Sequence, residues 1–176
     1  MNFCNRLQLF HLIQHDGTGG ESLYVDAFEC AEKLRKINPK SYSILSNTPI
    51  PYHSAGDANI SIFPSPREYP ILNHDRRGEL YQVRFNNDDR SVLNNLNGDQ
   101  VEDFYKALKD WTNILRDPKN EFWIKLKPGL AVIMDNWRVL HGRASFTGQR
   151  RMVGCYINRD DYKSRVRAIL NQRVNF

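Results

Sequence analysis

The alternation of apolar and polar positions predicts a strand at the start of the chain. Residues 6–15 (RLQLFHLIQH) follow a two-residue period, which is typical of a strand. One face of this strand carries two histidines among aliphatic side chains: Leu7, Leu9, His11, Ile13 and His15. The other face carries Phe10 and Leu12, so we expect burial on both sides. The glycine-rich turn 16–20 and a second strand, 21–28, would complete a hairpin.

Helical periodicity replaces this alternation in three segments. We expect helices over about 28–37 and 41–47, and the clearest one over 98–118. At the start of the third helix, Asp99 and Glu102 resemble a capping box. Residues 49–78 hold most of the prolines and little periodicity, which predicts a long irregular excursion of the functional-loop type.

Four further strands complete the predicted elements. They are 78–87, the pair 122–126 and 130–135 joined as a hairpin by KPG, and 150–158. Strands far outnumber crossover helices, which favours a mainly β sandwich or barrel with flanking helices over a doubly wound parallel sheet. A length of 176 residues predicts one domain over 1–176.

Composition and charge narrow the classes of partner. The net charge of +5 is spread along the chain except in the basic segment 159–176, which we interpret as a solvated helix face. Without a groove-reading helix or interleaved aromatics, we expect no nucleic-acid partner. No apolar run reaches the length of roughly 20 residues that a membrane span needs. Cys4, Cys30 and Cys155 form no C-x-x-C pair, so we expect free thiols in an intracellular, reducing compartment.

Candidate chemistry lies at His141 and on the strand that follows it. His141 alone is compatible with an ordinary hydrogen-bonding histidine. On a two-residue period, however, Arg150, Met152, Gly154 and Tyr156 share one face. If that face lines a pocket, it offers a guanidinium for a carboxylate and an aromatic wall. The alternative is that Arg150 and its neighbour are exposed cations at a strand end.

Several segments carry a resemblance to a known family. They are GGESLYVDAF, RFNNDDR, DPKNEFWIKLKPG and the long run beginning DNWRVLHGRASFTG. Together they resemble the trimethyllysine dioxygenases and, more distantly, the gamma-butyrobetaine hydroxylase and taurine dioxygenase-like enzymes. The resemblance implies a double-stranded β-helix (jelly-roll) fold. It also implies hydroxylation of trimethyllysine at C3, the first step of carnitine biosynthesis, with Fe(II), 2-oxoglutarate and optionally ascorbate.

The resemblance assigns expected roles to six residues. His141 resembles the distal histidine of the iron-binding triad of two histidines and a carboxylate. Arg150 resembles the arginine that holds the distal carboxylate of 2-oxoglutarate, and Ser22 the hydroxyl that assists it. Tyr156 resembles one wall of the cage for the trimethylammonium group. Asn86 and Asn87 fall in a segment where polar contacts to the substrate are expected, whereas Asn136, Trp137 and Arg138 are expected to be scaffold.

The iron site that this resemblance implies is incomplete in the sequence. None of the five histidines begins an H-x-D or H-x-E pair. His11 and His15 do not replace it, because at roughly 3.3 Å per residue they lie about 13 Å apart along a strand. We therefore expect a partial dioxygenase domain, incomplete at its N-terminus, with little activity alone. The alternative is a non-catalytic partner of an intact dioxygenase. A homodimer and a mitochondrial or cytoplasmic location both remain open.

Overall fold

The computed structural model describes residues 5–57, 60–62 and 68–170. Its strands and helices, in chain order, are β1 (Asn5–Asp16), β2 (Ser22–Asp26), α1 (Ala27–Ile37), α2 (Pro39–Asn47), β3 (Ile50–Pro51), β4 (Ser54–Asp57), β5 (Ile60–Ile62), β6 (Glu68–Tyr69), β7 (Leu72–His74), β8 (Leu80–Val83), α3 (Gly98–Leu115), β9 (Phe122–Ile124), β10 (Ala131–Asp135), β11 (Val139–Arg143), β12 (Gln149–Asn158) and α4 (Arg159–Ile169). The predominance of strands agrees with the predicted class.

The chain divides into two compact units, and each is described by itself. The helical unit comprises Leu23–Trp123 and Trp137–Gly142. The sheet unit comprises Asn2–Ser22, Ile124–Asn136 and Arg143–Phe176. The prediction of one domain over 1–176 stays a prediction.

Both hairpins predicted from the sequence are wrong. β1 pairs with β10 and β12, in the order β10-β1-β12, whereas β2 lies between β11 and β9. The same separation applies to β9 and β10, which belong to different sheets. Short turns join these strands in sequence, but strands consecutive in the chain enter alternate sheets. Long-range pairing therefore overrides the local hairpin signal. β11 was not predicted at all, although it contains His141.

A β-bulge reverses the direction in which the side chains at the end of β1 point. Leu12 lies opposite Met152, but Gln14 lies opposite Arg151, so β1 contains one extra residue between these pairs. A one-residue insertion reverses which side chains point to which face. His15 consequently lies opposite Arg150, while His11 lies opposite Val153 on the other face. The prediction that His11 and His15 share a face is therefore wrong.

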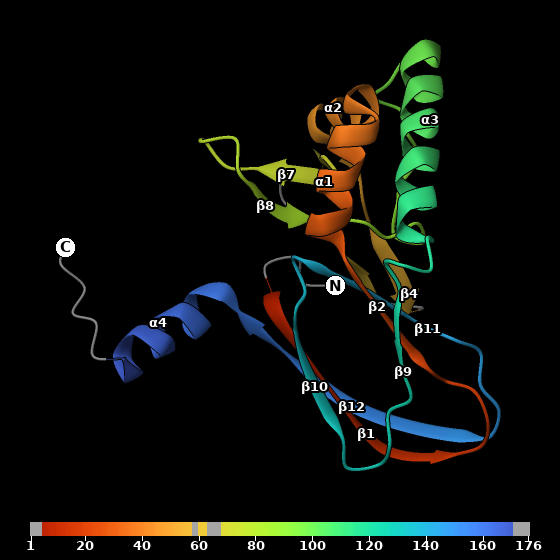
Figure 1. Cartoon of the computed structure of the whole chain (residues 1–176), viewed down its shortest axis with the longest axis vertical. Helices are drawn as coiled ribbons and strands as arrows, with labels where there is room; N and C mark the ends of the chain where they lie inside the picture. The colour runs from red at the N-terminus through yellow and green to blue at the C-terminus, as the bar shows by residue number, and fades with distance from the viewer. Residues whose placement is uncertain (1–4, 58–59, 63–67, 171–176) are drawn as a thin grey trace. The chain divides into compact units, whose positions relative to one another are not determined.

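The main hydrophobic core belongs to the helical unit. Figure 1 shows α1, α2 and α3 gathered together, and every residue of the buried cluster lies between Val25 and Leu115. Leu34, Leu45, Phe104 and Trp111 have no exposed surface. The Phe85 ring meets the edge of Trp111 at 6.3 Å. Apolar residues at helical spacing thus form the core that the periodicity predicted.

The helix caps refine the predicted boundaries. The capping box of α3 is formed by Asn97 and Gln100, not by Asp99 and Glu102: the Asn97 side chain accepts from the Gln100 N–H, and the Gln100 side chain accepts from the Asn97 N–H. Both candidate pairs have the correct spacing, so the sequence alone did not separate them. Asn38 caps α2 at the Ser41 N–H, and Pro39 occupies the first turn, where its missing N–H costs little.

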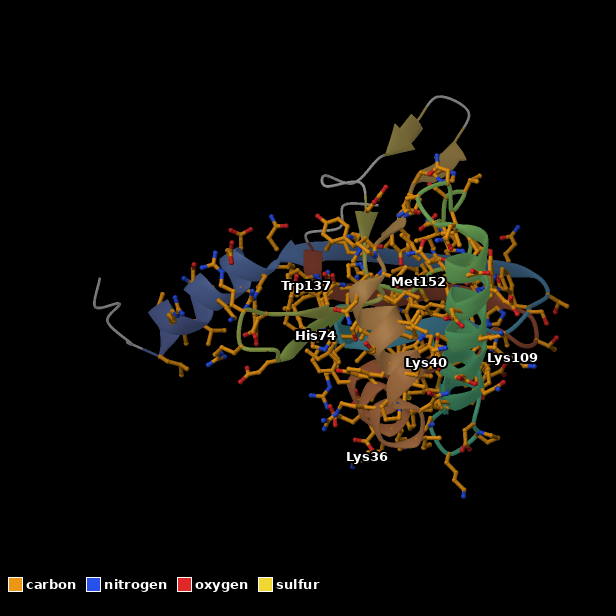
Figure 2. The ribbon with its side chains drawn as sticks, turned by 90° about the horizontal axis from the view of Figure 1, so that it is seen from above. Lys36, Lys40, His74, Lys109, Trp137 and Met152 are labelled. Atoms are coloured by element: carbon orange, nitrogen blue, oxygen red, sulfur yellow. The ribbon has the colours of Figure 1, made fainter. Side chains whose placement is uncertain are left out.

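Within the predicted irregular excursion 49–78, the described residues include short strands. β3 pairs with β6, and β7 pairs with β8. The predicted strand 78–87 is shortened to β8. His74, labelled in Figure 2, lies at the end of β7, and its Nε2 is 2.8 Å from the Tyr42 hydroxyl of α2.

The C-terminal part of the sheet unit ends in a helix with no buried residues. Figure 1 shows β12 leading into α4, which agrees with the predicted solvated face as far as residue 169. Cys30 and Cys155 are free thiols, as predicted, and burial raises the pKa of Cys30 to about 11. Cys4 lies outside the described residues. Among the helices that the structure describes, none has the length and apolar character of a membrane span.

Candidate functional site

The six expected site residues are divided between the two units. Ser22, Arg150 and Tyr156 belong to the sheet unit, whereas Asn86, Asn87 and His141 belong to the helical unit.

The shared face predicted for β12 is confirmed. Residues directly opposite in an antiparallel ladder point to the same side. Met152, Gly154 and Tyr156 lie opposite Leu12, Phe10 and Gln8, respectively, and Arg150 lies opposite His15. Gly154 is required by the backbone, because a Cβ there would collide with the carbonyl oxygen of Leu9. This face therefore presents a guanidinium at one end and a phenol ring at the other.

At the Tyr156 end, a buried glutamine fixes the aromatic ring. The Gln8 amide nitrogen donates to the Tyr156 hydroxyl at 2.9 Å. Gln8 is buried, and its Oε1 has no hydrogen-bond partner among the described residues. Tyr156 itself is 43% exposed. The hydroxyl is thus held from one side while the ring remains accessible, as an aromatic wall for a cationic ligand requires.

At the other end, Arg150 lies in a cluster of cations around Phe146. The Arg150 and Arg143 guanidiniums are 5.7 Å and 4.3 Å from the centre of the Phe146 ring. The His15 ring meets the same phenyl group edge-on at 5.9 Å. Gly20 faces this cluster with a φ of 75°, where a Cβ would lie 3.6 Å from Arg150 Nε. A side chain at this position would be strained by the positive φ and would make tight contacts with His15 and Phe146.

Ser22 follows this cluster closely along the chain. The Gly20 N–H donates to Ser145 O at 2.9 Å, and the Ala144 N–H donates to Glu21 O at 2.9 Å. These bonds fix the segment that leads into β2 against the segment that precedes β12. Ser22 is buried and stands two residues after Gly20. The structure therefore brings the Ser22 backbone close to the Arg150 cluster within the sheet unit.

His141 lies in β11 of the helical unit. Residue 141 is exposed overall, yet partial burial of the imidazole lowers its pKa, and a hydrogen bond with the Val139 backbone offsets this only in part. A lowered pKa favours the neutral imidazole, the form that binds metals.

Asn86 and Asn87 lie in an exposed turn after β8. The Asn86 Oδ1 accepts from the Asp88 N–H at 3.0 Å, and its Nδ2 donates to Asp89 at 2.8 Å. These bonds give Asn86 a structural role in shaping the turn. The side chain of Asn87 is exposed.

Trp137 and Arg138 behave as the predicted scaffold. Arg138 pairs with Asp26 through two nitrogens, with a shortest distance of 2.7 Å. Asp26 also caps α1 by accepting from the Phe28 and Glu29 N–H groups. Burial raises the pKa of Asp26, but Arg138 and these N–H groups outweigh it, so that the net pKa is lowered. The Trp137 carbonyl accepts from the Val83 N–H at 2.9 Å.

Two further observations limit the chemistry of the described residues. In the ranges 5–57, 60–62 and 68–170, no three His, Cys, Asp or Glu side chains gather as a metal site would require. The helical unit also has an open groove of about 1030 Å³ between α1, α2 and the β7–β8 hairpin. Its lining includes Tyr42 and His74 but none of the six expected site residues. The groove is therefore not the site that the sequence predicted.

Four residues of the sheet unit that lie around Tyr156 or Arg150 were not predicted from the sequence. Gln8, Gly20, Arg143 and Phe146 hold or surround the side chains that were predicted. The GTGG run signalled unusual backbone conformation, and Arg143 was visible beside His141. Neither signal told which residues lie beside Arg150, because that depends on long-range pairing.

Comparison with protein families gives one match over most of the chain. The family described as "Taurine catabolism dioxygenase TauD, TfdA family" matches residues 2–156.

Curated relatives are similar over nearly the whole chain. The chain is 50% identical over 161 residues to "Trimethyllysine dioxygenase" of Meyerozyma guilliermondii, covering 91% of this chain and 40% of that protein. It is 43% identical to "Trimethyllysine dioxygenase, mitochondrial" of Gallus gallus, covering 93% and 39%. It is 35% identical to "Gamma-butyrobetaine dioxygenase" of Homo sapiens, covering 96% and 44%. The chain thus spans about two fifths of the length of these relatives.

Solved structures confirm the predicted jelly-roll class. "PvcB, an Fe, alpha-ketoglutarate dependent oxygenase" superposes with a TM-score of 0.61 at 18% identity, covering 89% of this chain and 53% of that one. "AAD-2 in complex with Mn(II) and N-oxalylglycine" gives a TM-score of 0.60 at 14% identity, covering 88% and 63%. At these identities the likeness shows the fold alone.

Proposed function

The chain belongs to the TauD, TfdA family of dioxygenases, and from this premise we propose that it forms the distal part of an Fe(II)- and 2-oxoglutarate-dependent oxygenase site. The proposed reaction is hydroxylation of trimethyllysine at C3. The proposed substrate is supported by 50% identity to a protein named trimethyllysine dioxygenase. Because the chain spans about two fifths of that relative, the activity of the whole relative is carried over as a proposal only.

The residues around Arg150 fit a dicarboxylate. The guanidiniums of Arg150 and Arg143 both lie against the Phe146 ring. Gly20, which has no side chain, lies beside Arg150. A guanidinium donates two parallel hydrogen bonds to a carboxylate. We assign Arg150 to the distal carboxylate of 2-oxoglutarate, and we assign Ser22, two residues from Gly20, to a supporting hydroxyl contact.

His141 is the proposed iron ligand in this chain. Its lowered pKa favours the neutral ring that ligates a metal. It supplies one of the three ligands that such a site needs, and the described residues hold no cluster that would supply the others. When bound, iron would supply the activation of dioxygen: one oxygen atom would enter the C–H bond to give the alcohol, and the other would enter 2-oxoglutarate, which would lose carbon dioxide and become succinate. Ascorbate would serve only to keep the iron reduced.

Tyr156 is the proposed wall for the trimethylammonium group. Its accessible ring, held by Gln8, offers a cation–π surface to a cation that cannot donate a hydrogen bond. Asn86 and Asn87 remain proposed polar contacts to the substrate. The proposal involves a small-molecule partner and no nucleic acid, and a homodimer stays a prediction. We also propose an intracellular location, mitochondrial or cytoplasmic, because the Gallus gallus relative is named as mitochondrial.

One observation carries the proposal. The register of β1 and β12 puts Arg150 and Tyr156 on one face, so a carboxylate-binding and a cation-binding group look into the same side of the sheet. The co-substrate 2-oxoglutarate needs a carboxylate-binding group, and the trimethylammonium group of the proposed substrate needs a cation-binding one.

Calorimetric titration of 1–176 tests the proposal. With EDTA present, 2-oxoglutarate should bind saturably, and Arg150→Met should weaken it about tenfold or more, because a charge-assisted contact is lost. Trimethyllysine should bind more tightly than lysine to the wild type, with the difference reduced in Tyr156→Leu and kept in Tyr156→Phe. Absence of saturable 2-oxoglutarate binding, or equal binding by Arg150→Met, would refute the proposal.

A second candidate function is a non-catalytic partner of an intact dioxygenase. It is favoured by the absence of any H-x-D or H-x-E pair in the 176 residues, together with the lack of a metal-type cluster in the described ranges. It differs from the first candidate in one measurable respect, since it needs no binding of 2-oxoglutarate by this chain.

A further inference from the structure

His15 has a position that its place in the sequence does not suggest. The β-bulge after Leu12 turns His15 onto the face of Arg150, which it directly opposes across the β1–β12 ladder. His11, four residues earlier, opposes Val153 on the other face. The two histidines of this strand are therefore in different environments, although the sequence makes them look equivalent.

The surroundings of His15 leave one ring nitrogen without a protein partner. His15 Nε2 is buried and makes no hydrogen bond to any described residue. The ring packs edge-on against Phe146 at 5.9 Å. A buried polar atom of this kind normally has a partner. The missing partner is therefore expected to come from a ligand or a water molecule.

His15 and Arg150 lie beside the same stretch of backbone. A Cβ on Gly20 would lie 3.1 Å from His15 Cε1 and 3.6 Å from Arg150 Nε. Both side chains therefore lie close to Gly20, which places no side chain between them. The neighbouring carboxylate of Glu21 is held by Lys125 at 3.1 Å. Glu21 makes no hydrogen bond with His15 Nε2.

The charges at this end of the sheet select an anion. Arg143 and Arg150 both lie against Phe146, and His15 adds a third nitrogen donor. Glu21 lies near this cluster, and its pKa is lowered mainly by a backbone hydrogen bond and by Lys125, with a smaller contribution from His15. A planar carboxylate has enough acceptor sites for a bidentate guanidinium and one further donor.

We propose that His15 is the second donor to the carboxylate that Arg150 holds, through Nε2–H. This inference rests on the proposed function, which assigns that carboxylate to 2-oxoglutarate. It adds a positioning contact for the co-substrate, because Arg150 alone recognises any carboxylate, whereas Arg150 and the directly opposite His15 would fix the position of the carboxylate group from two sides. A purely structural His15 would pack against Phe146 and leave co-substrate affinity unchanged when replaced by a residue of similar size.

Two substitutions at His15, each with a matched control at His11, separate these roles. His15→Leu keeps the bulk and removes the donor, whereas His15→Gln keeps a donor at similar reach. His11→Leu and His11→Gln make the same chemical changes on the opposite face. The dissociation constants of 2-oxoglutarate and of glutarate are measured for each protein by titration calorimetry with EDTA present. Glutarate carries carboxylates without the oxo group.

We expect His15→Leu to raise both dissociation constants about tenfold or more, since a hydrogen bond to a charged group is lost. His15→Gln should restore most of the affinity, and both His11 variants should bind like the wild type. In the nitrogen-15 spectrum of the histidine side chains, the His15 signal, identified by its loss in His15→Gln, should shift when 2-oxoglutarate is added.

The outcomes are distinguishable. If His15→Leu binds both ligands like the wild type while Arg150→Met does not, the inference fails and the proposed function stands. If the wild type binds neither ligand, both fail. If His15→Leu is unfolded by circular dichroism, the His15 signal decides: a shift on adding 2-oxoglutarate supports the inference, and an unchanged signal overturns it.

Discussion

The helical unit contains the main buried cluster of the described residues, whereas one face of the sheet unit exposes apolar side chains. Phe104 and Trp111 of the helical unit have no exposed surface, and the whole buried cluster belongs to that unit. In the sheet unit, Ile133 is 63% exposed and Val153 is 53% exposed. Both lie on the face opposite to that of Arg150 and Tyr156, since Ile133 opposes Leu9 and Val153 opposes His11.

This difference separates stability from recognition in the chain. In the helical unit, burial removes apolar surface from water and provides the main stabilising term. In the sheet unit, the register of the strands decides which side chains can meet a ligand. A slip of one residue would exchange the face of β12 that carries Arg150 and Tyr156 for the face that carries Val153. Substitutions in the two units should therefore fail in different assays.

The largest effect is expected in the helical core. Phe104→Ala should destabilise the protein by about 3–5 kcal/mol, because it leaves a cavity at a site with no solvent access. Ile133→Ala in the sheet unit should change stability by less than about 0.5 kcal/mol, since that side chain is mostly in water. Urea unfolding followed by far-ultraviolet circular dichroism measures both. Equal losses would mean that the exposed face is packed in solution.

The next effect concerns association. We expect 1–176 to self-associate through the apolar face of the β10-β1-β12 sheet, because contiguous exposed apolar surface favours contacts between chains. Ile133→Thr combined with Val153→Thr should shift size-exclusion elution and light scattering towards the monomer mass. A monodisperse wild-type monomer with a sharp thermal transition would contradict this expectation.

A smaller effect on stability is expected at Asp26, which caps α1 and pairs with Arg138. Asp26→Ala should cost about 1–2 kcal/mol, because it removes the cap of α1 as well as the ion pair. Asp26→Asn keeps the cap and should cost below about 1 kcal/mol, since Asp26 and Arg138 are 40% and 52% exposed and solvent screens the pair. Similar costs in urea unfolding would show that the ion pair, not the cap, dominates.

The lowered pKa of Asp26 also gives a pH dependence with a fixed sign. The native pKa lies below the ordinary value of 3.8, so this group's contribution to stability is present above pH 3.8 and is lost as pH falls through the native pKa. Asp26→Asn should flatten that acid limb of stability against pH. An unchanged limb would assign the acid sensitivity to other carboxylates.

The smallest effect is expected for metal affinity. A single imidazole does not replace three preorganised ligands, so 1–176 should bind Fe(II) weakly and His141→Ala should change that affinity little. Anaerobic titration calorimetry measures both. Stoichiometric binding at micromolar concentration would require further ligands beyond His141 and would contradict the expectation.

The sequence predicted the elements better than their pairing. The long helix before Pro118 and the shared face of Arg150 and Tyr156 follow from local periodicity, and the structure confirms both, with the helix at Gly98–Leu115. The two hairpins were wrong because turn chemistry is local, whereas the assignment of β1 and β2 to different sheets depends on distant strands.

The same limit explains the missed surroundings of Arg150. The extra residue in β1 has no signature in RLQLFHLIQH, yet it decides that His15, and not His11, lies beside Arg150. The caps of α3 show a milder case, since two overlapping residue pairs had the correct spacing and side-chain geometry chose between them. The roles of His141, Ser22, Asn86 and Asn87 came from family resemblance alone.

Chemical-shift mapping of 2-oxoglutarate on nitrogen-15-labelled 1–176, with EDTA present, tests most directly the claim that the sheet unit carries a dicarboxylate site. The predicted result is a saturable set of amide shifts around residues 15–22 and 143–151, absent in Arg150→Met, with the core of α1 and α3 unchanged. A titration that leaves these amides unmoved, or that moves only residues of the groove between α1, α2 and the β7–β8 hairpin, would contradict the account.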